Sequence, residues 1–240
     1  MNVLITGISK GLGLKLAQTL LKNKWVVYGI SRSITPELEQ LISDHNANIK
    51  WLQYDLTDTN NLKPLVFKDW IGTKTPIHAF VNNAALAYDD IITNMNIDTL
   101  ENMYRVNVFS PLMITKFVIR QMLLHQIKGS IVHVSSISVH TGYKGLSMYA
   151  STKGALEAFS KNTAREWGGL GIRSNCVVAG FMETEMSSTL STDQKNRIYK
   201  RTSLKQQVDT NSVAETIAFL LSDESKSITG QNINVDCGTI

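Results

Sequence analysis

Short apolar runs alternate with longer segments of helical periodicity along the whole chain. The apolar runs have the length of buried strands and lie at residues 2–6, 25–30, 49–53, 78–82, 130–135, 172–178 and 231–235. Between them apolar residues recur every three to four positions, which predicts helices near 11–23, 36–45, 59–71, 97–126, 148–168 and 210–222. Continuous Val, Ile and Leu runs are typical of parallel strands covered on both faces.

This alternation predicts an α/β fold with a doubly wound parallel sheet of about seven strands. Right-handed crossovers would place the ligand crevice at the carboxyl ends of the strands. Thr6, Asn83, Ser136 and Gly180 all lie at or just beyond predicted strand ends, so we expect them on one rim. The length of 240 residues and the lack of an internal repeat favour a single domain over 1–240.

A glycine-rich turn joins the first predicted strand to the first predicted helix. Glycines let the backbone approach a ligand closely, and the helix N-terminus offers unpaired N–H groups and a positive dipole end. The segment therefore predicts a phosphate-binding turn. Its spacing, Gly-x3-Gly-x-Gly, differs from the usual Gly-x-Gly-x2-Gly of dinucleotide folds, and a plain turn is the alternative. The expected phosphate and cofactor contacts are Gly7, Ser9, Lys10, Gly11, Leu12 and Gly13.

Tyr149 and Lys153 lie four residues apart in a predicted helix, so their side chains project from the same face. A lysine ammonium beside a phenol favours the phenolate, so we expect Lys153 to lower the pKa of Tyr149 toward working pH. Ser136, thirteen residues upstream, would hold a substrate oxygen against this acid/base. Ser135 competes for that role, and a simple surface pair is the alternative for the tyrosine and lysine.

The ordered motifs together resemble the short-chain dehydrogenase/reductase family over essentially the whole chain. The match begins with the glycine turn and continues through Ser136 and Tyr149-x3-Lys153. Further matching segments are Asp55-Leu56, Asn82-Asn83-Ala84, Asn107, Gly180 to Met186 and Gly230 to Gly238. The chain departs from the family pattern at Ala85, Ala179 and Cys237, which replace a glycine, a proline and a glycine.

The resemblance implies a Rossmann-type fold, a nicotinamide cofactor and a set of site residues. It implies a catalytic set of Asn107, Ser136, Tyr149 and Lys153, in which Asn107 holds a water that connects to the lysine and Lys153 also binds the nicotinamide ribose. It implies further cofactor contacts at Ser31, Arg32, Asp55, Leu56, Asn83, Ala84, Gly180, Met182 and Thr184. Family members are commonly tetramers, so we expect a homotetramer or homodimer that uses surfaces at 213–221 and 233–235.

The end of the second predicted strand favours NADPH over NADH. An acid at this position would bind the ribose hydroxyls and repel a phosphate, but the chain has Ser31-Arg32-Ser33. The guanidinium of Arg32 can bind a phosphate through two parallel hydrogen bonds, and Lys10 adds a second positive charge. Solvated loop charges are the alternative interpretation.

The substrate is expected to be a small molecule with a carbonyl or secondary alcohol group. The overall pattern is most similar to β-ketoacyl-[acyl carrier protein] reductases, but the arginines that dock the carrier correspond to Lys128 and Leu170 here. A small ketone, a sugar or another secondary metabolite is therefore at least as well supported. Expected pocket walls are 87–91, 139–146 and a lid at 181–205. A non-catalytic NADPH-binding sensor is the alternative of another class, and the intact tyrosine–lysine pair argues against it.

Composition excludes several other classes. The net charge of +4 is mild and its lysines and arginines are scattered, so nucleic acid is not an expected partner. No apolar stretch reaches membrane-spanning length, and the chain opens directly with a strand, which argues against a signal peptide. The two cysteines and five histidines show no metal-ligand spacing, so we expect no metal, reduced thiols and a cytoplasmic location. His133 is expected to be a satisfied core residue.

Overall fold

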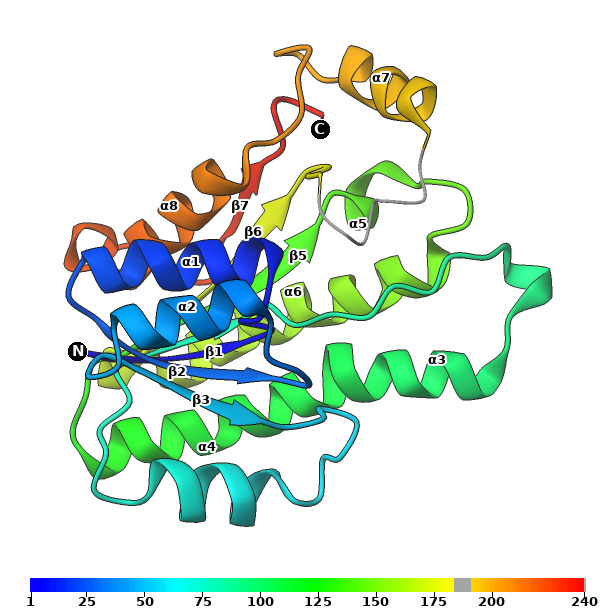
Figure 1. Ribbon diagram of the computed structural model, residues 1–240. Helices are drawn as coiled ribbons and strands as arrows, with labels where there is room; N and C mark the ends of the chain where they lie inside the picture. Colours follow the sequence, from blue (N-terminus) through cyan, green and yellow to red (C-terminus); the bar gives the residue numbers. More distant parts are fainter. Residues whose placement is uncertain (184–190, 240) are drawn as a thin grey trace.

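Seven parallel strands form one continuous sheet in the computed structural model, which describes residues 1–183 and 191–239 (Figure 1). The spatial order is β3-β2-β1-β4-β5-β6-β7, so the strand order reverses between β1 and β4. A ligand crevice is expected at this reversal in sheets of this kind. The strands are β1 Asn2–Thr6, β2 Val26–Ser31, β3 Ile49–Gln53, β4 Ala79–Asn82, β5 Ser130–Ser136, β6 Arg173–Ala179 and β7 Asn232–Val235.

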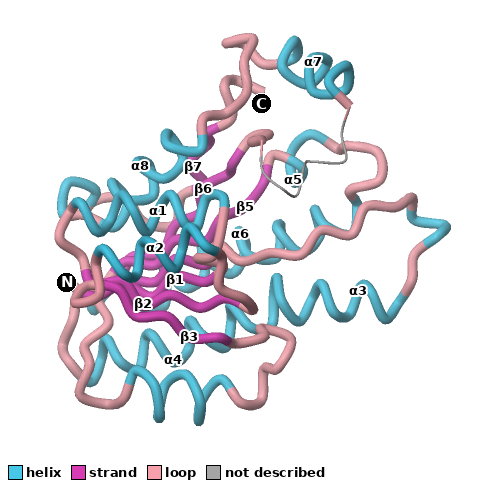
Figure 2. Tube along the Cα trace, in the orientation of Figure 1, coloured by secondary structure: helices cyan, strands magenta, loops and turns pink. Residues whose placement is uncertain are grey.

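Helices cover both faces of the sheet (Figures 1 and 2). One face carries α1 (Gly11–Lys22), α2 (Pro36–Asp44) and α8 (Thr210–Leu221). The other carries the π-helical η1 (Leu62–Ile71), α4 (Ser110–Leu124) and α6 (Ser147–Trp167). The remaining elements are the short η2 (Ile92–Asn94), α3 (Ile97–Tyr104), η3 (Arg105–Phe109), α5 (Ser138–Thr141), η4 (Gly168–Leu170), α7 (Thr192–Arg201) and η6 (Asp223–Ser225).

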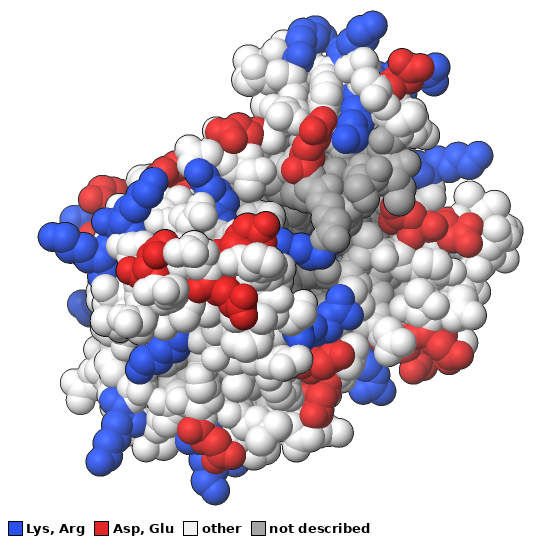
Figure 3. All heavy atoms as spheres, viewed as in Figure 1, with Lys and Arg blue, Asp and Glu red and all other residues white. Residues whose placement is uncertain are grey.

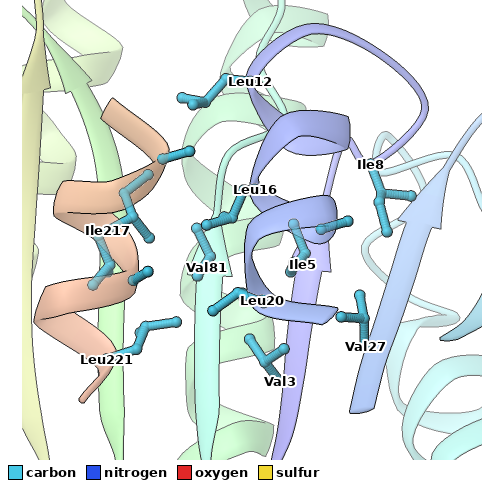
Figure 4. Close-up of a cluster of buried hydrophobic side chains, with 14 of the residues drawn as sticks. Val3, Ile5, Ile8, Leu12, Leu16, Leu20, Val27, Val81, Ile217 and Leu221 are labelled. Carbon is cyan, nitrogen blue, oxygen red and sulfur yellow. The ribbon is translucent and has the colours of Figure 1, made fainter. Parts of the chain in front are cut away.

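The core on the first face lies between the sheet and the pair α1 and α8 (Figure 4). Leu16 and Leu20 of α1 and Ile217 of α8 meet Val3 and Val81 of the sheet, and all five side chains are fully buried. Burying a Leu or Ile side chain stabilises a fold by about 1.5–3 kcal/mol. This packing fixes the N-terminus of α1 against the edge of the sheet where β1 ends.

The predicted strands are confirmed to within one residue at each end, but the helices differ more. The helix predicted over 59–71 begins three residues later, as the π-helical η1 at Leu62. The helix predicted over 97–126 consists of α3, the π-helical turn η3 and α4. Helix α5 and helix α7 were not expected. Helix α7 has no buried residue, so no apolar periodicity marks it, although Ser191 and Gln194 form a capping box at its start.

One polar residue of β5, His133, lies in the core between the sheet and α6. His133 is fully buried, and its ring meets the rings of Phe80 and Phe159 edge-on, with centroids 6.2 and 5.8 Å away. His133 is a core residue, as predicted. The expectation that its hydrogen bonds are satisfied is wrong, because neither ring nitrogen has a partner among the described residues. Burial, reinforced by the charge of Lys153, lowers the pKa of His133 from 6.5 to about 3.

The low pKa of His133 predicts a specific loss of stability in acid. Between pH 6.5 and about 3 the unfolded chain binds a proton at this position and the folded chain does not. The free energy of unfolding therefore falls as pH falls through this window, by roughly 1 kcal/mol per pH unit from this residue. Urea denaturation at pH 7, 6, 5 and 4 should show a steeper decline for the unmodified chain than for His133→Leu. Parallel curves for the two proteins would contradict the assignment.

Candidate active site

The glycine turn forms a cradle at the N-terminus of α1. Gly7 and Gly11 have φ values of +74° and +55°, which favour glycine. A Cβ atom on Gly13 would lie 2.0 Å from the carbonyl oxygen of Gly7, so only glycine fits there. The side chain of Lys10, the N-cap residue, does not cap the helix. The first N–H groups of α1 are therefore available to bind an anion such as a phosphate.

The end of β4 is tied to this cradle. The amide Nδ2 of Asn83 donates hydrogen bonds to the carbonyl oxygens of Thr6 and Gly7, at 3.0 and 3.1 Å. The hydroxyl of Thr6 accepts hydrogen bonds from the backbone N–H groups of Asn83 and Ala84, both at 3.2 Å. The structure thus brings together Gly7, Asn83 and Ala84, three of the predicted cofactor-binding residues.

The end of β2 is held against the other side of the cradle. The hydroxyl of Thr35 donates to the carbonyl oxygen of Ser9 at 2.7 Å. Ser31 is buried and accepts a hydrogen bond from Nε1 of Trp51 at 2.8 Å, whereas Arg32 is exposed. Figure 3 shows Lys and Arg side chains near the middle of the face that carries this corner and around α7 above it. The strand β2 ends at Ser31 and is followed by Arg32 and Ser33, so its own end carries no acidic residue.

Asp55 and Leu56 follow β3 and have different environments. Asp55 is exposed, and its Oδ1 accepts the N–H of Thr57 at 2.9 Å. Leu56 is buried, and its carbonyl oxygen accepts a hydrogen bond from the hydroxyl of Ser110 at the start of α4. The loop after β3 is therefore anchored, and Asp55 remains accessible to a ligand.

Lys153 is buried beneath Tyr149 on α6. Its ammonium donates a hydrogen bond to the carbonyl oxygen of Val134 at 2.8 Å and lies 5.6 Å from the centroid of the Tyr149 ring. The predicted neighbours are thus confirmed as neighbours. Tyr149 is half-buried, with part of its surface still in contact with solvent.

The predicted direction of the tyrosine titration is wrong. Burial, and then the negative charge of Asp89, raise the pKa of Tyr149. Burial also lowers the pKa of Lys153 to about 8. The low dielectric penalises phenolate and ammonium alike, and the ammonium faces the Tyr149 ring and donates a hydrogen bond to a backbone carbonyl. The phenol consequently keeps its proton at neutral pH.

The two serines at the end of β5 point to different environments. Ser135 is buried, and its hydroxyl donates to Oε1 of Glu157 at 2.5 Å. Ser136 is half-buried at the last position of the strand, and its hydroxyl accepts the N–H of Ser138 at 3.2 Å. Because adjacent strand residues face opposite ways, only Ser136 retains a hydroxyl proton for a ligand at the carboxyl edge.

Asn107 lies in the π-helical turn η3 and is fully buried. Its side chain exchanges two 2.8 Å hydrogen bonds with the backbone of Leu86 and donates a third, of 3.0 Å, to the hydroxyl of Thr152. Asn107 therefore joins the segment after β4 to α6, next to Lys153. These bonds fix the side chain of Asn107 in place, and its predicted contact with a water stays a prediction.

The segments expected around a substrate meet at the same edge. The N–H of Asp90 donates to the carbonyl oxygen of Gly145 at 3.0 Å, which joins the walls at 87–91 and 139–146. A Cβ atom on Gly180 would lie 2.7 Å from Cα of Asp236, so β6 leaves the sheet through a tight contact. Met182 is partly buried against the first core. Thr184, another predicted cofactor contact, lies outside the described residues.

The base of α7 is attached to the final turn of the chain. The backbone N–H groups of Ser203 and Leu204 donate to the carbonyl oxygens of Gly238 and Cys237, at 3.0 and 3.1 Å. Phe181, just after β6, packs toward the same helix, with its ring centroid 6.0 Å from that of Tyr199 on α7. The region expected to form a lid is thus connected to the residues that follow β7.

Three residues near the site have roles that were not anticipated, although Asp89 belongs to the wall expected at 87–91. Asp89 acts electrostatically on Tyr149, Thr152 binds Asn107, and Glu157 binds Ser135. Helical spacing contained a signal for the last one, since Glu157 lies four residues after Lys153 on the same face of α6. Asp89 lies in an irregular loop, where no periodicity reveals which way a side chain points. Among the described residues, no group of His, Cys, Asp or Glu side chains is arranged to hold a metal ion.

Comparison with known proteins agrees with this geometry. A family model described as enoyl-(acyl carrier protein) reductase matches residues 7–239. The 3-oxoacyl-[acyl-carrier-protein] reductase FabG of Salmonella typhimurium is 32% identical over 236 residues, which are 98% of this chain and 95% of that protein. FabG of Escherichia coli is 32% identical over 237 residues, with the same two shares.

Solved structures have the same fold. The structure of ElxO with NADP bound has a TM-score of 0.89 and 29% identity, and the alignment covers 99% of this chain and 98% of that one. A 4-hydroxyisoleucine dehydrogenase complexed with NADH has a TM-score of 0.92 at 23% identity, with the same two shares, and supports the fold alone. The chain belongs to the short-chain dehydrogenase/reductase family of NAD(P)-dependent oxidoreductases, which act on CH–OH and C=O groups.

Proposed function

We propose that this chain, as one domain over 1–240, reduces a ketone with NADPH or oxidises the matching secondary alcohol. The observation that carries the proposal is the buried Lys153, fixed between the carbonyl of Val134 and the ring of Tyr149. Nucleotide binding alone does not require a partly exposed phenol over a buried ammonium. The pair lies on the helix that packs on β5, and the glycine cradle follows β1 two strands away in the same sheet.

In the reducing direction Tyr149 donates its hydroxyl proton to the carbonyl oxygen of the substrate. Because the pKa of Tyr149 is raised, the hydroxyl is protonated at neutral pH and can donate this proton when the substrate oxygen gains negative charge. Lys153, whose pKa of about 8 leaves it mostly charged at pH 7, stabilises the phenolate that remains. Ser136 hydrogen-bonds the same substrate oxygen and orients it. Asn107 holds the segment after β4 against α6.

The cofactor would lie along the edge between β2 and β6. The glycine cradle would bind its phosphates, Asn83 and Ala84 would line its path, and Lys153 would hold its nicotinamide ribose. A bound nicotinamide supplies the hydride. The exposed Arg32, with Lys10 beside the cradle, supports NADPH over NADH, because two cations favour the extra phosphate. The NADP-bound ElxO structure supports the same choice.

A second candidate is a 3-oxoacyl-[acyl carrier protein] reductase. The curated relatives that carry this name favour it. Against it, the two positions expected to dock the acidic carrier hold Lys128 and Leu170, and Leu170 is 57% exposed as an apolar side chain. A single cation gives weaker electrostatic attraction than two arginines. A free small-molecule ketone is therefore the preferred substrate class.

We propose a homotetramer or homodimer in the cytoplasm. The free edge of β7 supports further association, and Phe219 of α8 is 44% exposed. The remaining apolar side chains of α8 lie in the core, so most of the expected 213–221 surface is used within the chain. Both cysteines are free thiols, which supports a reducing compartment. Among the described helices, none is long and apolar enough to cross a membrane.

Tyr149→Phe tests the proposed mechanism. The variant lacks the proton donor but keeps the ring over Lys153, so turnover with an accepted ketone should fall at least ~100-fold while NADPH affinity stays within about threefold. Initial rates by NADPH absorbance, and affinity by NADPH fluorescence, measure the two quantities. Tyr104→Phe, a tyrosine hydroxyl bound to Ser151 on the outer side, serves as the matched control. Near-normal turnover of Tyr149→Phe would rule out the assigned role.

Arg32→Ala tests cofactor choice. Loss of the guanidinium should raise the KM for NADPH about tenfold or more and leave the KM for NADH nearly unchanged, because only NADPH carries the additional phosphate. Lys22→Ala, at the far end of α1, provides a control for the loss of one positive charge. Equal kcat/KM values for the two cofactors in the unmodified protein, or a preference for NADH, would overturn the NADPH proposal.

A further inference from the structure

Glu157 lies at the centre of a polar cluster that the proposed reaction does not use, in which Glu157 and Ser135 are buried and His140 and Asn232 are exposed. The cluster consists of Ser135, His140, Glu157 and Asn232. Oε1 of Glu157 accepts the hydroxyl of Ser135 at 2.5 Å, and Oε2 accepts the side-chain amide of Asn232 at 2.7 Å. Nε2 of His140 lies 3.1 Å from both carboxylate oxygens. Three donors from three separate elements therefore meet on one side chain.

The cluster joins the two elements that carry proposed catalytic groups, β5 and α6, to α5 and β7. Ser135 precedes Ser136 in β5, and His140 lies on α5, which follows Ser136 directly. Glu157 is on α6, one turn beyond Lys153 and two turns beyond Tyr149. Asn232 adds the first residue of β7. The carboxylate thus fixes the segment 135–141 relative to the helix that presents the tyrosine and lysine.

The energetics favour a specific role for this carboxylate over simple packing. Glu157 is only 8% exposed, and burying a carboxylate costs several kcal/mol unless hydrogen bonds compensate for the lost water. Here both oxygens accept bonds from polar donors, which are stronger when the acceptor is charged. An apolar residue at this position would fill the space without that cost, but it would not set the distance between α5, β5 and α6.

We propose that Glu157 is a positioning residue that holds the loop carrying Ser136 in register with Tyr149. The proposal rests on the proposed function, in which Ser136 and Tyr149 contact the same substrate oxygen. Reaction rates are sensitive to such placement, since a displacement of about 1 Å can reduce turnover ~100-fold.

Glu157→Gln is the first test. The amide keeps the size of the side chain but presents N–H groups toward Asn232, so one of the three hydrogen bonds is lost. We expect kcat to fall about tenfold, with the KM for NADPH within twofold and the melting temperature within about 3 °C of the unmodified protein. Glu166→Gln, an exposed glutamate on the same helix, is the control and should match the unmodified protein.

His140 provides a second test that does not alter the buried carboxylate. His140→Gln keeps an N–H donor at the same reach, so its turnover should stay close to that of the unmodified protein. His140→Leu removes the donor, so its turnover should fall to the same extent as that of Glu157→Gln. Because the bonds from His140 and Asn232 hold the same side chain, their losses are coupled, and the double variant of His140→Leu and Glu157→Gln should lose less turnover than the product of the two single losses.

Hydrogen exchange separates this proposal from the proposed function. Amides of residues 135–141 should exchange faster in Glu157→Gln than in Glu166→Gln, and this readout needs no turnover. If the unmodified protein reduced no ketone, the proposed function would fail. The exchange rates would still decide whether Glu157 fixes residues 135–141. Unchanged exchange over 135–141, additive rate losses in the double variant, or a kcat for Glu157→Gln that equals the control would each overturn the proposal.

Discussion

The buried ammonium of Lys153 is the constraint on which the arrangement of the candidate site at the carboxyl edge of the sheet depends. A lysine with 2% exposure is stable only when its charge has a partner, and the carbonyl of Val134 supplies one at 2.8 Å. This bond crosses from α6 to β5 and cannot form unless the helix lies at one height along the strand. Tyr149 lies one turn before Lys153 on the same helix, so the same bond sets the height of the phenol.

Two further polar ties extend this constraint across the sheet. Asn107 links α6 to the segment after β4, and Asn83 links the end of β4 to the glycine cradle. The path from the phenol to the cradle therefore runs through hydrogen bonds of two asparagine side chains, each of which is fixed by more than one partner. Such rigid support is what holding reactants in a near-attack geometry requires.

Much of this organisation could be predicted from sequence, and the failures have physical causes. Strand periodicity located Ser136, Asn83 and the glycine turn on one rim, because it depends only on which residues are buried. Helix α7 was missed because it buries nothing, and the π-helical turn at Asn107 because its apolar pattern differs little from that of a regular helix. The tyrosine titration was misjudged because spacing along a helix reports proximity but not desolvation.

Cys237 illustrates how a departure from the family pattern can be tolerated. It stands where the family has glycine and has a φ of +57°, a conformation that costs a non-glycine residue about 1 kcal/mol. The bonds from Ser203 and Leu204 to this turn hold the strained backbone in place. The residues that follow α7 thus depend on the backbone conformation of this turn, so a change at Cys237 is transmitted to the base of that helix.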